Sequence, residues 1–407
     1  MGGTCLGLAV TALSLGLLGC GEKSGAVPIP AEPIGPTAPA GPGTPPAPAP
    51  ATDPWSIVRY LSSDALEGRA PGTPGSAKAR AAIVAELKRC GVTPAIGVSF
   101  EQPTDGPAIN LIGHLPGRDP ARHVLLSAHY DHLGIHGGEI MNGADDNAAA
   151  VGSVLAVACE LARSGPRAAT VIVALWDAEE PPHFLTDRMG SRWFVAHPHV
   201  PLSSIEAAVV LDLVGAGLWP GSPLHFALGA ETSPALARAV DATPPDGFTL
   251  VQAGLHLVED LVTGGHQPWS DYDAFRDAEV PVLFLSNGQT AHYHQPSDDF
   301  ATLDLPKLSA QTRGLAALVA RLADLPASDA PRFSPFERPE VDRAAARQLV
   351  AGALSADRGE ARDALEADLV GLPTADRLAL RAAVQRVQCL AAGHYPTSLC
   401  RTLGARR

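Results

Sequence analysis

The sequence has 407 residues, of which 46% are hydrophobic, 18% charged and 5% aromatic. This length allows two or three domains, or one large α/β domain with appendages, and the apolar fraction excludes a wholly disordered or fibrous chain. With 30 basic against 43 acidic residues the net charge is −13, which argues against a general nucleic-acid or anionic-membrane binder.

The start of the chain is predicted to be an export signal. Residues 6–18 (LGLAVTALSLGLL) form an apolar run that is too short to span a bilayer but has the length of a signal-peptide core. The segment Leu17-Leu18-Gly19-Cys20 follows and resembles the lipobox of bacterial lipoproteins, whose cysteine is lipidated. A buried helix is the alternative, but no polar face or cap accompanies the run. We predict a lipoprotein signal peptide over residues 1–20 and a lipid anchor at Cys20, with the protein periplasmic or cell-surface exposed.

Residues 21–54 contain 11 prolines among alanine, glycine and threonine. Because proline fixes φ and removes backbone donors, this stretch is predicted to be a semi-rigid tether without a core of its own.

From residue 55 to 325 the pattern alternates between helices and buried strands, which predicts an α/β domain with a predominantly parallel or mixed central sheet. Short runs rich in valine, isoleucine and leucine predict strands at 109–115, 124–128, 171–176, 208–214 and 282–286. Helical spacing of apolar residues predicts helices at 77–90, 147–161 and 305–325.

Residues 326–407 form a second compositional zone. A proline-bearing connector ends near residue 339, and three amphipathic helices are predicted at 343–354, 358–369 and 375–390. They carry no catalytic constellation, so we expect a helical cap or docking surface. In an oxidising compartment Cys389 and Cys400 could close a small loop, whereas Cys159, inside an apolar helix, is expected to be an inert core residue.

Five short segments place ligand-type side chains at strand ends or helix starts. They contain His129 with Asp131, Asp145 with Asp146, Glu179 with Glu180, Asp212, and His292 to Asp299 with His294. Taken singly, most fit a purely structural role: a surface His–Asp pair, helix capping, a solvated acidic loop or a polar turn. Asp212 is different, because an ionised carboxylate within an apolar run is costly without a partner.

Together these segments resemble the zinc aminopeptidase-like metallopeptidases, the superfamily that includes glutamate carboxypeptidase, glutaminyl cyclase and the transferrin receptor. The closest resemblance is to single-domain secreted bacterial aminopeptidases. It runs from Trp55 to Leu325 and opens with the segment 64–75 (DALEGRAPGTPG). The large insertion of the carboxypeptidase and receptor branches has no room in this range.

The resemblance implies two zinc ions that share the carboxylate of one aspartate. Motif alignment assigns that role to Asp145 and leaves Asp146 for capping or support, although the chemistry alone does not distinguish the two. The other implied ligands are His129 and Asp212 for one ion, and Glu180 and His294 for the other.

The resemblance also implies three supporting roles. Glu179 matches the general base that takes a proton from the metal-bound water, Asp131 matches the partner of His129, and Tyr293 matches a phenol that stabilises the oxyanion. The longer loop after the two glutamates, residues 181–189, is expected to line the site. The remaining histidines, His132 among them, match no motif and are expected at the surface or in loops.

The sequence therefore predicts a dizinc aminopeptidase that acts on peptides with a free N-terminus. A glutaminyl-cyclase-like acyltransferase with a single zinc, and a catalytically silent binding lipoprotein, are the alternatives. A serine hydrolase is excluded because no Gly-x-Ser-x-Gly elbow is present.

Overall fold

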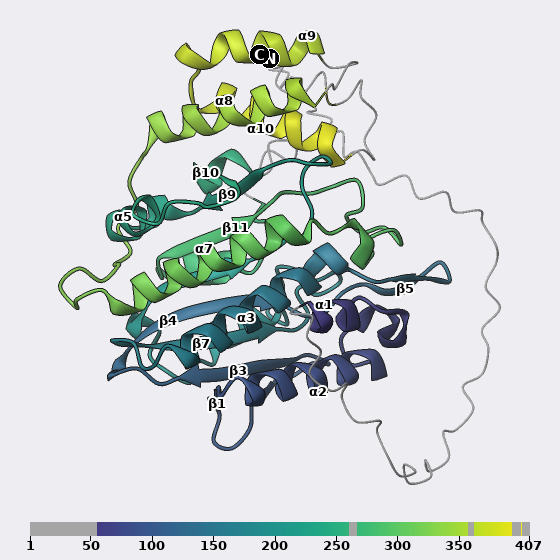
Figure 1. The fold of residues 1–407 in the computed structure, drawn as a ribbon, viewed down its shortest axis with the longest axis vertical. Coiled ribbons are helices and arrows are strands. Elements are labelled where there is room, and N and C mark those ends of the chain that lie inside the picture. The colour runs from purple at the N-terminus through teal and green to yellow at the C-terminus, as the bar shows by residue number, and fades with distance from the viewer. Residues whose placement is uncertain (1–54, 260–266, 357–361, 393–399, 401–407) are drawn as a thin grey trace, which may run out of the picture. The chain divides into compact units, whose positions relative to one another are not determined.

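The computed structural model describes residues 55–259, 267–356, 362–392 and 400 (Figure 1). The predicted signal peptide and tether lie outside these residues. The described residues belong to one compact unit. Among them, no helix is long and apolar enough to cross a membrane.

The predicted α/β class is confirmed. The helices are α1 (Ser56–Leu61), α2 (Pro74–Arg89), α3 (Ala149–Arg163), α4 (Gly190–Ala196), α5 (Pro234–Asp241), α6 (Tyr272–Asp277), α7 (Leu305–Asp324), α8 (Pro339–Ser355), α9 (Arg362–Gly371) and α10 (Arg377–Ala392). The strands are β1 (Thr93–Pro94), β2 (Glu101–Pro103), β3 (Ile109–Leu115), β4 (Asp119–His129), β5 (Gly134–His136), β6 (Glu139–Met141), β7 (Ala169–Trp176), β8 (Ile205–Leu211), β9 (Leu224–Leu228), β10 (Thr249–Ala253) and β11 (Val282–Ser286).

Within the described residues, nine strands form one mixed sheet in the order β1-β3-β7-β4-β8-β11-β9-β10, with β2 paired to β3. Its centre is parallel, because β4 pairs in parallel with both β7 and β8, and β8 with β11. Towards one edge, β3 pairs antiparallel with β1, β2 and β7; towards the other, β9 pairs antiparallel with β11 and parallel with β10. A separate hairpin, β5–β6, lies between β4 and the turn η2 (Ala144–Ala148) in the chain.

Two apolar layers cover the sheet, because successive strand side chains point to opposite faces. The cluster on one face contains Val124, Leu126 and Val173 and is completed by α1, α2, α3 and α7. The cluster on the other face contains Leu125 and Ile172 and is completed by α4 and α6. Every residue of β7 is buried, as its continuous apolar run predicts.

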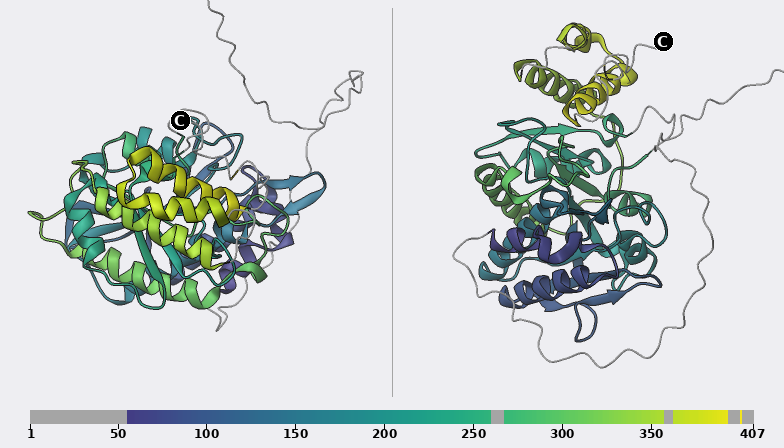
Figure 2. Two further views of the ribbon diagram at one scale, coloured as in Figure 1. Left: turned by 90° about the horizontal axis from the view of Figure 1, so that it is seen from above. Right: turned by 90° about the vertical axis from the view of Figure 1, so that its right-hand side faces the viewer.

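The three C-terminal helices form where the sequence predicts them, and they lie against one another (Figure 2). Helix α8 contacts β10, and its Leu349 and Val350 share a buried cluster with Val251 of β10 and Val384 of α10. The C-terminal segment therefore packs on the β9–β10 end of the sheet through apolar side chains.

Two disulfides link the described cysteines. Cys389 pairs with Cys400, as their spacing allowed. Cys90, which follows α2, pairs with Cys159 of α3, their Cα atoms 4.5 Å apart. The expectation that Cys159 is an inert core thiol was wrong, because the packing of α2 against α3 brings a second cysteine to it from 69 residues away.

Candidate metal centre

The ends of three neighbouring parallel strands bring the candidate side chains to one edge of the sheet. The last residue of β4, His129, lies opposite Trp176, the last residue of β7. Glu179 and Glu180 come shortly after β7, and Asp212 directly after β8. The carboxyl ends of parallel strands meet at one edge, which is where α/β folds place their sites. The His129, Glu179, Glu180 and Asp212 side chains are all buried.

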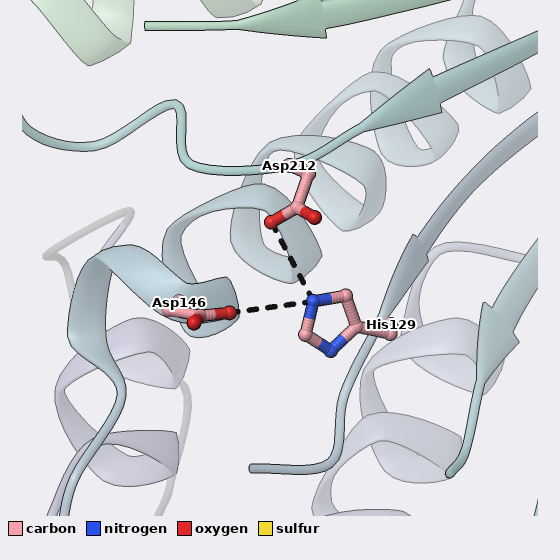
Figure 3. A group of neighbouring side chains, drawn as sticks. All are labelled: His129, Asp146 and Asp212. Carbon is pink, nitrogen blue, oxygen red and sulfur yellow. Dashed lines mark ion pairs between the residues drawn. The ribbon is translucent and has the colours of Figure 1, made fainter. Parts of the chain in front are cut away.

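Two groups of side chains share the carboxylate of Asp146. On one side, Oδ1 of Asp146 lies 3.4 Å from Nε2 of His129, and this nitrogen lies 3.5 Å from Oδ1 of Asp212 (Figure 3). On the other side, Oδ2 of Asp146 lies 3.3 Å from Nε2 of His294, which lies 3.1 Å from Oε2 of Glu180. Each oxygen of Asp146 therefore faces its own pair of one histidine and one carboxylate.

A further histidine joins the second group. Nδ1 of His132 lies 2.7 Å from Oε1 of Glu180 and 3.9 Å from Oδ2 of Asp146. His132 lies in the loop after β4, which is one of its two expected places, but it is fully buried and not at the surface. It follows the end of β4 by three residues, and the approach of this loop to the segment after β7 brings it to Glu180. Spacing alone gave no signal for this contact.

Burial sets the charges of these groups. Burial, with added repulsion from Asp212, raises the pKa of Glu179 well above its usual range. Burial likewise raises the pKa of Asp212. For His294 burial acts the other way, but the nearby carboxylates of Asp146 and Glu180, 3.3 and 3.1 Å from its Nε2, outweigh it and raise the pKa to about 10. Crowded, buried carboxylates of this kind are stable only when cations or protons compensate them.

Four of the facing atoms have no hydrogen-bond partner among the described residues: Nε2 of His129, Nε2 of His294, Oδ2 of Asp146 and Oδ1 of Asp212. Buried polar atoms without a protein partner are rare, and a bound ion often satisfies them. Imidazole nitrogens and carboxylate oxygens are ligands that zinc takes, so the side chains present fit a pair of such ions.

Comparison with known families agrees with this geometry. Residues 110–319, slightly more than half of the chain, match the sequence profile of peptidase family M28. The chain belongs to peptidase family M28. It is thereby placed among the metallopeptidases, a class of hydrolases, and the resemblance seen in the sequence is confirmed.

Several known proteins are similar to this M28 chain. The uncharacterized protein YfbL of Escherichia coli strain K12 is 26% identical over 237 residues, which cover 53% of this chain and 72% of YfbL. Among solved structures, the LapA aminopeptidase of Legionella pneumophila has a TM-score of 0.53 at 16% identity, covering 67% of this chain and 71% of that one. A Zn-dependent exopeptidase from Parabacteroides distasonis gives 0.51 at 20% identity, with 67% and 99% covered. The glutaminyl cyclase of Porphyromonas gingivalis gives 0.53 at 21% identity, with 65% and 96% covered. At these identities the structural likeness shows the fold alone.

The position predicted for the shared carboxylate is corrected by one residue. Asp145, predicted to lie between the two groups, turns away from them, and its Oδ1 accepts hydrogen bonds from the amides of Gly215 and Ala216 at 2.7 and 3.0 Å. Asp146 takes the shared place because the backbone is non-helical at this residue, so the two neighbouring side chains diverge. Asp298 holds the turn: its two carboxylate oxygens accept the amides of Asp145 and Asp146.

Asp131 supports both strand ends. Its Oδ1 lies 3.5 Å from Nδ1 of His129, as expected for a partner of that ring. The two oxygens of Asp131 also accept the amides of Glu179 and Glu180 at 3.1 and 3.2 Å. One buried carboxylate thus orients a histidine after β4 and both glutamates after β7.

Arg69 is a cation to which the sequence analysis gave no role. It has no exposed surface, and its guanidinium donates to the carbonyls of Tyr130, Leu61, Asn142, Gly143 and Asp146. Burial lowers the pKa of Arg69 to about 10, so the side chain stays charged at neutral pH. Arg69 lies in the segment 64–75 that carries the family resemblance, and it ties this segment to the loops on both sides of the β5–β6 hairpin.

The other sequence predictions concern groups at the rim. The ring of Tyr293 stacks on that of His294, with centroids 3.8 Å apart, which places the phenol beside the second group. The loop 181–189 starts its turn at Glu180, whose carbonyl accepts the amide of His183. Its part in substrate preference stays a prediction.

One fully buried aspartate, Asp271, was not singled out from the sequence. Neither of its carboxylate oxygens has a hydrogen-bond partner among the described residues, and burial raises its pKa to about 7.

Proposed function

We propose that this M28 peptidase is a dizinc aminopeptidase. The observation that carries the proposal is the placement of Asp146, whose two oxygens face two separate histidine–carboxylate pairs. Two ions would then be held by Asp146 in common, one with His129 and Asp212 and the other with His294 and Glu180. His132 would position Glu180 through its 2.7 Å contact.

Zinc ions bound here supply Lewis acidity to a scissile carbonyl and acidify a water molecule. The side chains supply proton transfer and orientation. Glu179 is buried with Oε2 3.8 Å from Nε2 of His129, and it belongs to neither ligand group. Its carboxylate would accept the proton of the attacking water and pass it to the departing amine. The phenol of Tyr293 would donate to the oxyanion of the tetrahedral intermediate.

We propose peptides with a free N-terminus as substrates. This proposal is supported by the aminopeptidases among the proteins of similar fold. The net charge of −13 gives no support to nucleic acid as a partner.

We also propose that the protein is exported and held at a bacterial membrane by a lipid at Cys20. The sequence of residues 1–20 motivates this proposal, and the two disulfides support it, since disulfides persist mainly in oxidising compartments. Lipid labelling of the natural chain and of the Cys20→Ser variant tests it. Equal labelling of both would overturn it.

The test of the proposed activity is a panel of aminoacyl reporter substrates, each offered with a free and with an acetylated amine, beside zinc analysis of the full chain. We expect about two zinc ions per chain, turnover only of the free-amine substrates, and loss of turnover on exhaustive chelation. One zinc ion with cyclisation of N-terminal glutamine and no peptide hydrolysis would favour the acyltransferase. Zinc binding with no turnover of either kind would favour a silent binding protein.

A further inference from the structure

A second cluster of histidines lies at the opposite end of the central strands from the metal centre. His114 lies near the end of β3, His123 lies within the first half of β4, and His199 follows α4. His123 and His129 are six residues apart on β4, which separates them by about 20 Å. The two sites are therefore spatially independent.

The three imidazoles meet on one face of the sheet. Nε2 of His114 and Nε2 of His199 share a hydrogen bond of 2.7 Å, and the two ring centroids are 4.8 Å apart. The ring of His123 is 6.3 Å from that of His114, and its Nδ1 is paired with Oγ of Ser204. Nδ1 of His199 has no hydrogen-bond partner among the described residues.

The surroundings favour neutral rings. Burial lowers the pKa of His114 to about 4, and the nearby positive charge of a protonated His199 or His123 would lower it further. Burial also lowers the pKa values of His123 and His199. A neutral imidazole is the form that binds a metal ion, so no net proton has to leave the rings at neutral pH. One of the two Nε2 atoms carries the hydrogen of the 2.7 Å hydrogen bond, and an ion bound between the rings would require that hydrogen to move to Nδ1 of the same ring.

We propose that His114 and His199 form a binding site for a late divalent transition-metal ion, with Cu²⁺ the best match. Two nitrogens about 2.0–2.1 Å from a tetrahedral zinc ion would be about 3.3 Å apart. At the right angle of a square-planar site and a similar bond length they would be about 2.9 Å apart. The hydrogen-bonded nitrogens, 2.7 Å apart, would therefore have to separate less for a square-planar ion than for a tetrahedral one.

Partial exposure and neighbouring charge agree with this site. His114 and His199 are half-buried, whereas His123 is buried. Glu206 and Asp119 act on His123 through their charges, and Glu206 is bound by Arg122 through two hydrogen bonds. Imidazole nitrogens thus dominate the donor set, and nitrogen-rich sites select copper and nickel over magnesium and calcium.

The test is a Cu²⁺ titration of the full chain whose catalytic centre has first been loaded with zinc. Electron paramagnetic resonance reports nitrogen ligation of copper, while zinc content and peptidase turnover report on the other site. We expect one copper ion per chain with nitrogen hyperfine structure, and unchanged zinc content and turnover. His114→Ala and His199→Ala should each weaken copper binding at least about tenfold, the lower range for loss of even an outer-shell partner.

The matched control is His136→Ala, which removes an exposed histidine from the β5–β6 hairpin and should leave copper affinity unchanged. Thermal unfolding without copper shows whether each variant is folded, and His199→Gln replaces any variant that is not. The proposal is overturned if the His114 and His199 variants bind copper as tightly as the natural chain, if copper enters only by displacing zinc, or if no nitrogen-ligated copper is detected.

Discussion

Replacing Arg69 by lysine should destabilise the whole metal-binding edge of the sheet. The guanidinium donates to five backbone carbonyls and is fully buried. Lysine keeps the charge but has only three donors on a single nitrogen, so at least two of the five carbonyls lose their partner. A buried polar group without a partner costs about 1–3 kcal/mol, so the expected loss is roughly 2–6 kcal/mol.

Urea unfolding followed by tryptophan fluorescence, with chelator and again with excess zinc, measures this loss. The midpoint without metal should fall by about 1 M or more. The stabilisation gained on adding zinc should also shrink, because one carbonyl that Arg69 holds belongs to Asp146. Arg118→Lys is the matched control, since that side chain is 65% exposed. If Arg69→Lys unfolds at the same midpoint as Arg118→Lys, the role assigned to Arg69 is wrong.

Three further predictions concern separate parts of the molecule. Glu179→Gln should keep nearly normal zinc content, with turnover lowered roughly a hundredfold or more, whereas Glu180→Gln should lose zinc from one site. If metal analysis shows the reverse pattern, Glu179 is the zinc ligand and Glu180 the general base. Cys159→Ser removes a disulfide that spans 69 residues and should lower the free energy of unfolding by about 4 kcal/mol, because the unfolded chain gains conformational entropy. Urea unfolding under oxidising conditions measures this loss, and an unchanged midpoint would contradict the prediction. Burial lowers the pKa of His114 in the folded protein to about 4, below the 6.5 of a free imidazole. The unfolded chain therefore binds the proton first, and the stability of the fold should decrease as the pH drops from about 6.5 towards about 4. Melting temperatures across this range should fall less steeply for His114→Gln, and identical slopes would refute the assignment.

The strands of the sheet centre were predictable because their side chains are buried on both faces. The bounds of β3 and β11 agree with the apolar runs at 109–115 and 282–286 to the residue. Strands β9 and β10 were missed because they include half-buried or polar side chains that break the apolar pattern, whereas every residue of β11, which has the same length, is buried.

The candidate site was predictable at the level of motifs and not of side-chain direction. Which aspartate of the 145–146 pair faces the histidines depends on a kink in the turn and on Asp298, which lies about 150 residues further along the chain. The contact of His132 with Glu180 depends in the same way on how the loops after β4 and β7 approach each other. Local sequence carries no record of such long-range contacts.

The carboxylate of Asp146 is the centre of the proposed site, and zinc stoichiometry of two neighbouring variants tests its role. Asp146→Asn removes the charge that both proposed ions share, so we expect the bound zinc to fall from about two per chain to well below one. Asp145→Asn is the matched control, because an amide oxygen can still accept from Gly215 and Ala216, and it should hold close to two zinc ions. Retention of both ions by Asp146→Asn, with their loss from Asp145→Asn, would contradict the assignment of Asp146 as the shared ligand.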